Sequence, residues 1–343
     1  MNLSYDVLDL PTRHDFRIAR EGARLRRSVW VRLRAADGLE GWGEAAATPF
    51  YGETAETVVA ALPRLAEALG QARLDEEPLA LERAERVLAR ALGGNPSARA
   101  ALSAALHDLA GKRLGVPTWK LWGLEPEAPR SSFTIGLDTS ATFREKVREA
   151  TGYPILKLKV GTGRDEELLR IVREEAPAAV LRVDANTAWT AKQAIRALPL
   201  LREYGVELLE QPCAADDLDG LTQVRRRARI PVVADESCRV AADVPRLAGR
   251  VDGVNIKLAK CGSLREALRI AIAARAHRMS LMLGCMVEST LGIAAALQLA
   301  PLVDWVDLDG AALLAHDPFR GPGIGPDGAL RFNDTPGLGV QQA

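Results

Sequence analysis

Eight short apolar runs recur through the C-terminal two-thirds of the chain, and this periodicity constrains the fold more than any other feature. Each run is about the length of a strand buried on both faces. The runs are residues 133–137, 156–160, 181–185, 206–210, 231–235, 254–258, 281–285 and 305–309. Seven helix-like stretches separate them, which predicts a parallel (β/α) barrel. After the eighth run the chain reads HDPFRGPGIGPDG, which predicts a loop in place of the last helix.

The first 120 residues have a different pattern. Residues 27–47 alternate apolar and polar side chains around Asp37 and Gly38, which predicts antiparallel strands joined by a turn. Helical stretches follow near residues 54–69, 78–92 and 96–114, the last with Asn95 near its N-cap and Pro96 at its start. We expect an α+β domain over residues 1–120, the barrel over residues 121–315 and a C-terminal segment over residues 316–343.

The composition excludes several classes of function. The 343 residues carry 45 basic and 45 acidic side chains, so the electrostatic footprint of a nucleic-acid-binding protein is absent. We find no apolar run long enough for a membrane span, no secretory signal, and neither a CxxC nor a zinc-like spacing among the four cysteines. We therefore expect a cytoplasmic protein that acts on a small molecule, as a monomer or a homo-oligomer.

A polar residue lies near the end of each apolar run. These residues are Thr134, Lys159, Asp184, Glu210, Asp235, Lys257, Cys285 and Asp309. Because the active site of such a barrel lies at the carboxyl ends of its strands, we expect these side chains to converge. Three carboxylates on adjacent strands need a cation nearby, and an all-oxygen ligand set suits Mg²⁺. Asp184, Glu210 and Asp235 are therefore the predicted ligands, with Asn186 behind them. The structural alternative is three separate helix N-caps.

Lysine is rare in this chain, since only eight of the 45 basic residues are lysine. Lys157, Lys159 and Lys257 stand in apolar strand segments, and Lys159 and Lys257 would flank the carboxylates from opposite sides of a closed barrel. Burial and a nearby cation both lower the pKa of a lysine toward the value that a base needs. Two such bases facing one carbon fit removal of a proton α to a carboxylate and its return to the opposite face. That chemistry is racemisation or epimerisation.

The motifs KLK, DAN, EQP, ADES and NIKLAKCG resemble the muconate-lactonising-enzyme subgroup of the enolase superfamily, and GWGEA and YGET resemble its capping domain. The resemblance implies a (β/α)7β modified TIM barrel with an N-terminal α+β capping domain, to which residues 316–343 return. It also implies that Lys159 and Lys257 are the acid/base pair. Asp184, Glu210 and Asp235 would be the ligands of one Mg²⁺ per subunit.

The resemblance narrows the reaction through the eighth run, which ends in DLD at Asp307 and Asp309. This pair is similar to the DxD motif with which dipeptide epimerases hold the α-ammonium group of the substrate, and two carboxylates form a charge-assisted site for a cation. The expected reaction is Mg-dependent epimerisation of a dipeptide through a metal-stabilised enediolate. Thr134 and Cys285 would line the pocket, and Lys157 would neutralise the substrate carboxylate.

Other reactions stay open at this point. An o-succinylbenzoate synthase, an N-acylamino acid racemase or a muconate-type cycloisomerase would use the same barrel groups. From other classes, a Schiff-base aldolase would use Lys257 and leave the three carboxylates without a role, and a metal-stabilised barrel would have no activity. No role is predicted for Glu288.

The preferred dipeptide stays open as well. In the family, two loops of the capping domain contact the dipeptide side chains, here about His14–Ala23 and Pro49–Glu53. An Ala-Glu epimerase tends to place an arginine in the first loop. Arg17 or Arg20 could serve, but Glu21 aligns with that position, which leaves cationic and hydrophobic dipeptides open.

Overall fold

The predicted barrel is confirmed in the computed structural model, which describes residues 1–18, 22–72 and 79–343. Eight parallel strands form one sheet in chain order: β4 (Phe133–Ile135), β5 (Ile155–Lys159), β6 (Val180–Asp184), β7 (Val206–Glu210), β8 (Val232–Ala234), β9 (Gly253–Ile256), β10 (Ser280–Gly284) and β11 (Trp305–Asp307). The amide of Ser132, just before β4, donates a hydrogen bond to the carbonyl of Val306 in β11 (3.0 Å). This contact brings the first and last strands together.

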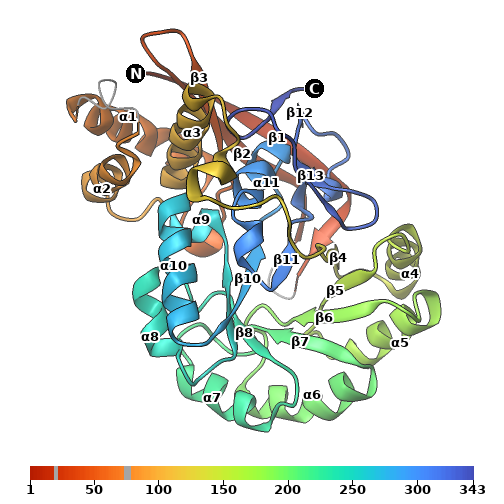
Figure 1. Cartoon of the computed structure of the whole chain (residues 1–343). Coiled ribbons are helices and arrows are strands. Elements are labelled where there is room, and N and C mark those ends of the chain that lie inside the picture. The colour runs from red at the N-terminus through yellow and green to blue at the C-terminus, as the bar shows by residue number, and fades with distance from the viewer. Residues whose placement is uncertain (19–21, 73–78) are drawn as a thin grey trace.

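Helices cover the outside of the barrel (Figure 1). They are α4 (Ser140–Glu149), α5 (Asp165–Glu175), α6 (Ala191–Glu203), α7 (Leu218–Arg227), α8 (Val244–Leu247), α9 (Leu258–Cys261), α10 (Leu264–Ala276) and α11 (Thr290–Leu297). In α5 the buried apolar stripe includes Leu168, Leu169 and Val172, as predicted. No α-helix follows β11 within residues 308–343, all of which are described, so the predicted loss of the eighth helix is confirmed.

The N-terminal residues form a three-stranded antiparallel sheet and three helices, which lie above the barrel in Figure 1. The elements are β1 (Asn2–Arg17), β2 (Gly22–Arg34), β3 (Glu40–Ala45), α1 (Ala55–Gln71), α2 (Leu81–Ala91) and α3 (Pro96–Leu114). The predicted turn between β2 and β3 is present, and Gly38 takes the positive φ of 88° that favours glycine there. β1 was not predicted, although residues 2–7 alternate polar and apolar side chains; half of the residues of this strand are exposed.

β3 and α3 pack so closely that two glycines are required between them. A Cβ atom on Gly41 would lie 1.9 Å from the carbonyl oxygen of Ala105, and one on Gly43 would lie 2.0 Å from that of Ala101. Both distances are far inside van der Waals contact. The GWG sequence of β3 therefore lets the sheet rest directly on the backbone of α3.

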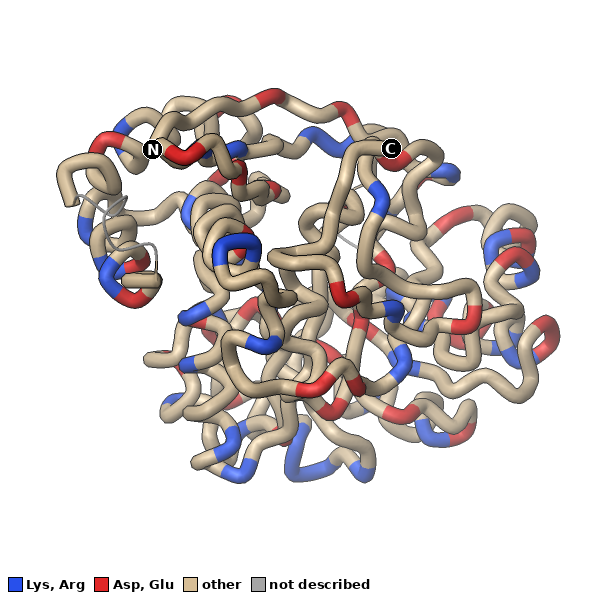
Figure 2. Tube along the Cα trace, turned by 45° about the horizontal axis from the view of Figure 1, so that its top comes forward, with Lys and Arg blue, Asp and Glu red and all other residues tan. Residues whose placement is uncertain are grey.

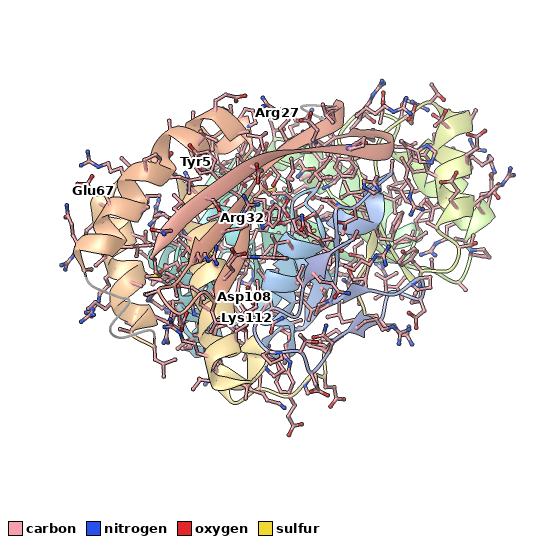
Figure 3. The ribbon with its side chains drawn as sticks, turned by 90° about the horizontal axis from the view of Figure 1, so that it is seen from above. Tyr5, Arg27, Arg32, Glu67, Asp108 and Lys112 are labelled. Carbon is pink, nitrogen blue, oxygen red and sulfur yellow. The ribbon has the colours of Figure 1, made fainter. Side chains whose placement is uncertain are left out.

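The C-terminal residues pack against these N-terminal elements. They form two short antiparallel pairs, β12 (Phe319–Arg320) with β15 (Gln341–Gln342), and β13 (Gly323–Ile324) with β14 (Leu330–Arg331). The buried carboxylate of Asp108 accepts hydrogen bonds from the amides of Trp42 (2.9 Å) and Leu338 (2.8 Å) and from Lys112 (2.8 Å). Seen from above, Asp108 and Lys112 lie side by side on α3 (Figure 3). This carboxylate links α3, β3 and the C-terminal segment.

The charged residues show no segregation by sign. Basic and acidic positions are interspersed over the trace in Figure 2. Among the described residues, every helix is too short or too polar to cross a membrane.

The β3–α3 contact generates a stability prediction. Replacing Gly43 with alanine forces a methyl group into the backbone of α3, and we expect the free energy of unfolding to fall by about 1–3 kcal/mol or more. Gly70→Ala is the matched control, because Gly70 is in α1 and a Cβ there meets nothing within 4 Å. We expect that change to stabilise by about 0.5–1 kcal/mol. Urea unfolding of both variants measures the difference, and equal stabilities would contradict the close-packing argument.

Candidate active site

The predicted strand-end residues converge on one cavity of about 100 Å³ at the carboxyl ends of the barrel strands. Nine of them line it: Thr134, Lys157, Lys159, Asn186, Asp235, Lys257, Cys285, Asp307 and Asp309. The remaining two, Asp184 and Glu210, have no exposed surface and interact with the lysines of this cavity. The parallel sheet therefore brings together residues that the chain separates by up to 175 positions.

Lys157 is the central cation of the cluster. Its ammonium group lies 2.6 Å from Glu210, 2.7 Å from Asp307 and 3.2 Å from Asp184, and its side chain is 1% exposed. Burial lowers the pKa of a lysine, but these carboxylates outweigh it and raise the pKa of Lys157 well above its usual value. Lys157 is thus a fixed positive charge inside the barrel, in the wall of the cavity.

Lys159 and Lys257 each hold one carboxylate of the cluster. Lys159 Nζ lies 2.7 Å from Asp184 Oδ2, and Lys257 Nζ lies 2.8 Å from Asp235 Oδ2. Lys159 ends β5 and Lys257 directly follows β9, four strands further round an eight-stranded barrel. The two ammonium groups therefore approach the cavity from opposite sides.

The pKa of Lys257 differs from the sequence-based expectation. Burial acts in the expected direction, but the charges of Asp235 and Glu210 outweigh it and raise the pKa well above the usual value. The expectation took account of burial, a cation and Lys157, but not of how close the carboxylates lie to each ammonium group.

The three carboxylates differ in how their charge is compensated. Burial raises the pKa of Glu210 to about 7, with the charge of Asp184 acting in the same direction. Burial acts the same way on Asp184 and Asp235, but the lysines beside them hold the pKa of each below its usual range. The lysines are Lys159 and Lys157 for Asp184, and Lys257 and Lys260 for Asp235.

The donor set suits a hard divalent cation in its chemistry. Asp184, Glu210 and Asp235 are buried oxygen donors from three adjacent strands, with a combined charge of about −3 when ionised. In the described part of the chain, no three acidic, histidine or cysteine side chains gather closely enough to enclose a metal ion. The groups closest to these three carboxylates are lysine ammonium groups. A bound cation would share with these lysines the task of compensating the carboxylates.

Asp307 and Asp309 form a second pair of buried carboxylates beside the cluster. Asp307 accepts from Lys157 and from Ser132 Oγ, each at 2.7 Å, whereas Asp309 accepts from the amide of Thr134 at 2.5 Å. Burial raises the pKa of Asp309 to about 7, and the charge of Asp307 raises it further. Burial acts likewise on Asp307, but Lys157 lowers its pKa below the usual value. A cationic ligand would therefore gain most from Asp309.

Several supporting residues were missed by the sequence analysis. Lys260 is fully buried, contacts the carboxylate of Asp235 and donates to the carbonyls of Asp235 (2.6 Å) and Asn255 (2.9 Å). The side chain of Asn255 in turn donates to Glu210 Oε1 (2.7 Å). Gln211 Oε1 accepts from the amide of Asp235 (2.8 Å). All three supporting residues lie within the motifs EQP and NIKLAKCG, but the sequence analysis assigned them no role.

The chain turns sharply just after the carboxylate-bearing strands. Asn186 and Gln211 both take positive φ angles, 43° and 32°. The turn at Asn186 lets its amide donate to Asp184 Oδ1 (2.9 Å) and its side chain to Oδ2 (3.2 Å). Asn186 therefore lies against Asp184, as predicted.

Glu44 joins the N-terminal sheet to the barrel, and Glu53 holds a loop within the N-terminal elements. Glu44 in β3 accepts from the amides of Ser289 (3.1 Å) and Gly292 (3.2 Å), which are unpaired donors at the start of α11. Glu53 accepts from the amide of Ser97 (3.0 Å) at the start of α3, and its loop carries Tyr51 into the cavity wall. The GWGEA and YGET motifs contain these glutamates, but their partners are far away along the chain and were not predicted.

Cys285 and Glu288 both lie near the end of β10. Cys285 lines the cavity, and burial raises the pKa of its thiol well above the usual value, with Asp309 acting in the same direction. Glu288 does not line the cavity; it accepts from the amide of Met286 (3.0 Å), which does. Burial raises the pKa of Glu288 to about 8, and Glu44 adds to the shift. Glu288 therefore shapes the segment after β10.

The first capping loop is only partly described. Arg20 and Glu21 lie outside the described residues. Arg17 pairs with Asp15 (2.8 Å) and does not line the cavity. Arg26 and Arg27 of β2, which the sequence analysis did not single out, do line it.

Comparison with known proteins gives the same assignment for both halves of the chain. Residues 4–123 match the model of the mandelate racemase / muconate lactonizing enzyme N-terminal domain, and residues 140–342 match that of the enolase C-terminal domain-like family. The L-Ala-D/L-Glu epimerase of Bacteroides thetaiotaomicron is 37% identical, over 100% of this chain and 88% of the relative. The L-Lys-D/L-Arg epimerase of Methylococcus capsulatus is 39% identical, over 96% of this chain and 95% of the relative.

A solved structure is similar over almost its whole length. The dipeptide epimerase of Enterococcus faecalis, complexed with Mg and L-Leu-L-Tyr, superposes with a TM-score of 0.92 at 33% identity and covers 99% of this chain and 98% of its own. The three relatives differ in the side chains of their dipeptides, so they do not select one for this chain. The chain belongs to the mandelate racemase / muconate lactonizing enzyme family of the enolase superfamily.

Proposed function

We propose that this protein is an isomerase that epimerises a dipeptide at the carbon α to its carboxylate, using one Mg²⁺. The observation that carries the proposal is the paired carboxylate of Asp307 and Asp309 at the same cavity as two opposed lysines. An ammonium group fits this pair. The similar enzymes named above act on dipeptides, which supports the proposal.

The two lysines would act on one carbon from opposite faces. With the α-carbon of the substrate between Lys159 and Lys257, one lysine takes its proton and the other returns a proton to the opposite face. Asp307 and Asp309 bind the α-ammonium group, Lys157 places a positive charge near the substrate carboxylate, and Thr134 and Cys285 line the pocket. The N-terminal elements exclude water above the site.

The metal ligands in this proposal are Asp184, Glu210 and Asp235, with Asn186 supporting Asp184. The ion would supply positive charge next to the substrate carboxylate and so favour loss of the neighbouring proton. Lys260 and Asn255 would hold Asp235 and Glu210 in place.

We further propose the division predicted from the sequence, with a capping domain over residues 1–120, the barrel over 121–315 and a returning segment over 316–343. A cytoplasmic location is supported by the four cysteines, which are all free thiols. A homo-oligomer remains compatible with this division.

Metal removal tests the carboxylate assignment. We expect EDTA to reduce epimerisation to background and added Mg²⁺ to restore it, because the ion would supply the positive charge that favours loss of the proton next to the substrate carboxylate. Asp235→Asn should lower the affinity for Mg²⁺ measured by calorimetry. Full activity after thorough demetallation would refute the site.

Proton exchange in D₂O tests the two bases. Lys257→Met and Lys159→Met should each reduce epimerisation by about 10²–10⁴-fold, because each removes one acid/base group. Lys257→Met should still exchange the α-proton of one epimer with deuterium, and Lys159→Met that of the other, as followed by proton NMR. Calorimetry of Mg²⁺ binding is the control for an intact site. Equal exchange of both epimers by either variant would exclude the two-base mechanism.

Blocking the substrate amine tests the pair of Asp307 and Asp309. An N-acetylated dipeptide cannot offer an ammonium group, and losing such a charge-assisted contact costs about 1.5–3 kcal/mol. We therefore expect kcat/KM to fall roughly ten- to a hundred-fold relative to the free dipeptide. If N-succinylated amino acids react faster than dipeptides, the protein is an N-acylamino acid racemase or o-succinylbenzoate synthase instead.

A further inference from the structure

A second cavity, of about 400 Å³, lies directly beside the proposed active site. It lies between β1 of the N-terminal sheet and β4 of the barrel, and residues of η6 (Gly310–Leu313) complete its wall. Phe16, Thr134 and Leu313 line both this cavity and the active-site cavity. Among the described residues, these three therefore border both spaces.

The sizes of the two cavities suggest that they work together. Sites for small molecules usually measure about 300–1,000 Å³. The active-site cavity, at about 100 Å³, can hold the reacting carbon and its carboxylate but not two large side chains. The second cavity supplies the missing volume.

Most of the charged groups in the wall of the second cavity already have partners. His14 pairs with Glu149 (2.7 Å), and Lys146 pairs with Asp138 (2.9 Å). Arg13 Nε donates to a main-chain carbonyl 3.1 Å away. A charged ligand group would have to displace one of these contacts, so the polar part of the wall does not favour one.

The rest of the wall is largely apolar and partly aromatic. The rings of Phe133 and Tyr153 stack with centroids 4.4 Å apart and an interplanar angle of 23°. Ile135, Leu313 and Ile324 add aliphatic surface. Such a wall gains free energy by burying an apolar side chain, and aromatic faces favour large ones.

The position of Thr134 indicates which part of a substrate reaches the second cavity. Its amide donates to Asp309 Oδ2 at 2.5 Å, and Thr134 lines both cavities. Asp309 belongs to the pair that would bind the α-ammonium group. The carbon bearing that ammonium group would therefore lie at the partition between the two cavities, one bond from its own side chain.

We infer that the cavity between β1 and β4 binds the side chain of the N-terminal residue of the dipeptide and selects large apolar residues at that position. This inference rests on the proposed dipeptide epimerisation. It concerns the N-terminal residue of the dipeptide only. Arg26 and Arg27 are not part of it, because they line the active-site cavity but not the second cavity.

Kinetics with matched dipeptides test the inference. Two series, L-Xaa-L-Glu and L-Xaa-L-Leu, vary the N-terminal residue among alanine, leucine, phenylalanine and aspartate. In whichever series reacts, we expect kcat/KM to be at least about ten-fold higher for leucine or phenylalanine than for alanine, and lowest for aspartate. The quantity compared among variants is the ratio of kcat/KM for N-terminal phenylalanine to that for N-terminal alanine.

Two alanines provide a matched pair of variants. Ala312 lines only the second cavity and Ala47 only the active-site cavity. Ala312→Phe should lower the phenylalanine-to-alanine ratio at least ten-fold, whereas Ala47→Phe should lower both values together and leave the ratio unchanged. Ile324→Ala, which removes volume from the wall, should raise kcat/KM for N-terminal tryptophan relative to leucine. Circular dichroism checks that each variant is folded.

The outcomes separate this inference from the proposed function. If no dipeptide exchanges its α-proton, both are wrong. If dipeptides react but the N-terminal residue has no effect, or if Ala47→Phe shifts the ratio as much as Ala312→Phe does, the function stands and the inference is overturned.

Discussion

The buried ion network at the carboxyl ends of the barrel strands is the interaction on which the rest of the site depends. Removing one partner of a buried ion pair commonly costs about 3–5 kcal/mol, because the other charge is left uncompensated. Here Lys157 contacts three carboxylates, and Asp235 contacts both Lys257 and Lys260. No member can be changed without affecting its neighbours. The network is stable because a rigid parallel sheet holds the charged groups of neighbouring strands at fixed positions.

The N-terminal elements depend on the barrel through helix termini. Glu44 accepts hydrogen bonds from amides at the start of α11, a barrel helix, whereas Glu53 accepts one at the start of α3, within the N-terminal elements themselves. Helix N-termini present unpaired donors and a partial positive charge, so a buried carboxylate is compensated there without a lysine. Burial nevertheless raises the pKa of both glutamates. These contacts place Tyr51, Arg26 and the end of β1 over the cavity without using the charges of the network.

The sequence predicted the barrel and the cluster for the same physical reason. Each strand–helix unit has a polar residue at the end of an apolar run. That residue identifies the strand and also places its own side chain at the site, as Lys159 and Asp184 illustrate. Lys260 does not, since it lies on the four-residue helix α9 and only the fold directs its side chain to Asp235. β1 was overlooked although residues 2–7 alternate polar and apolar side chains; it is an edge strand, it contains Pro11, and half of its residues are exposed. The network also set the pKa of Lys257, and no local pattern contains that information.

Substrate preference has to be set outside the network. Its members compensate one another, so a substitution within it changes chemistry and stability together. The wall of the second cavity carries no such constraint. It contains none of the lysines and carboxylates of the network; its His14–Glu149 pair is partly exposed and its Lys146–Asp138 pair is largely buried. In the proposed function, its apolar residues would contact the side chain of the substrate. Ala312 illustrates the point, since a larger side chain there would change the space for the N-terminal residue while every buried lysine keeps its carboxylate. Two similar enzymes are named for alanine- and lysine-containing dipeptides, and a third is complexed with a leucine-containing one. Such variety is expected where the residues that select the substrate are separate from those that carry out the reaction.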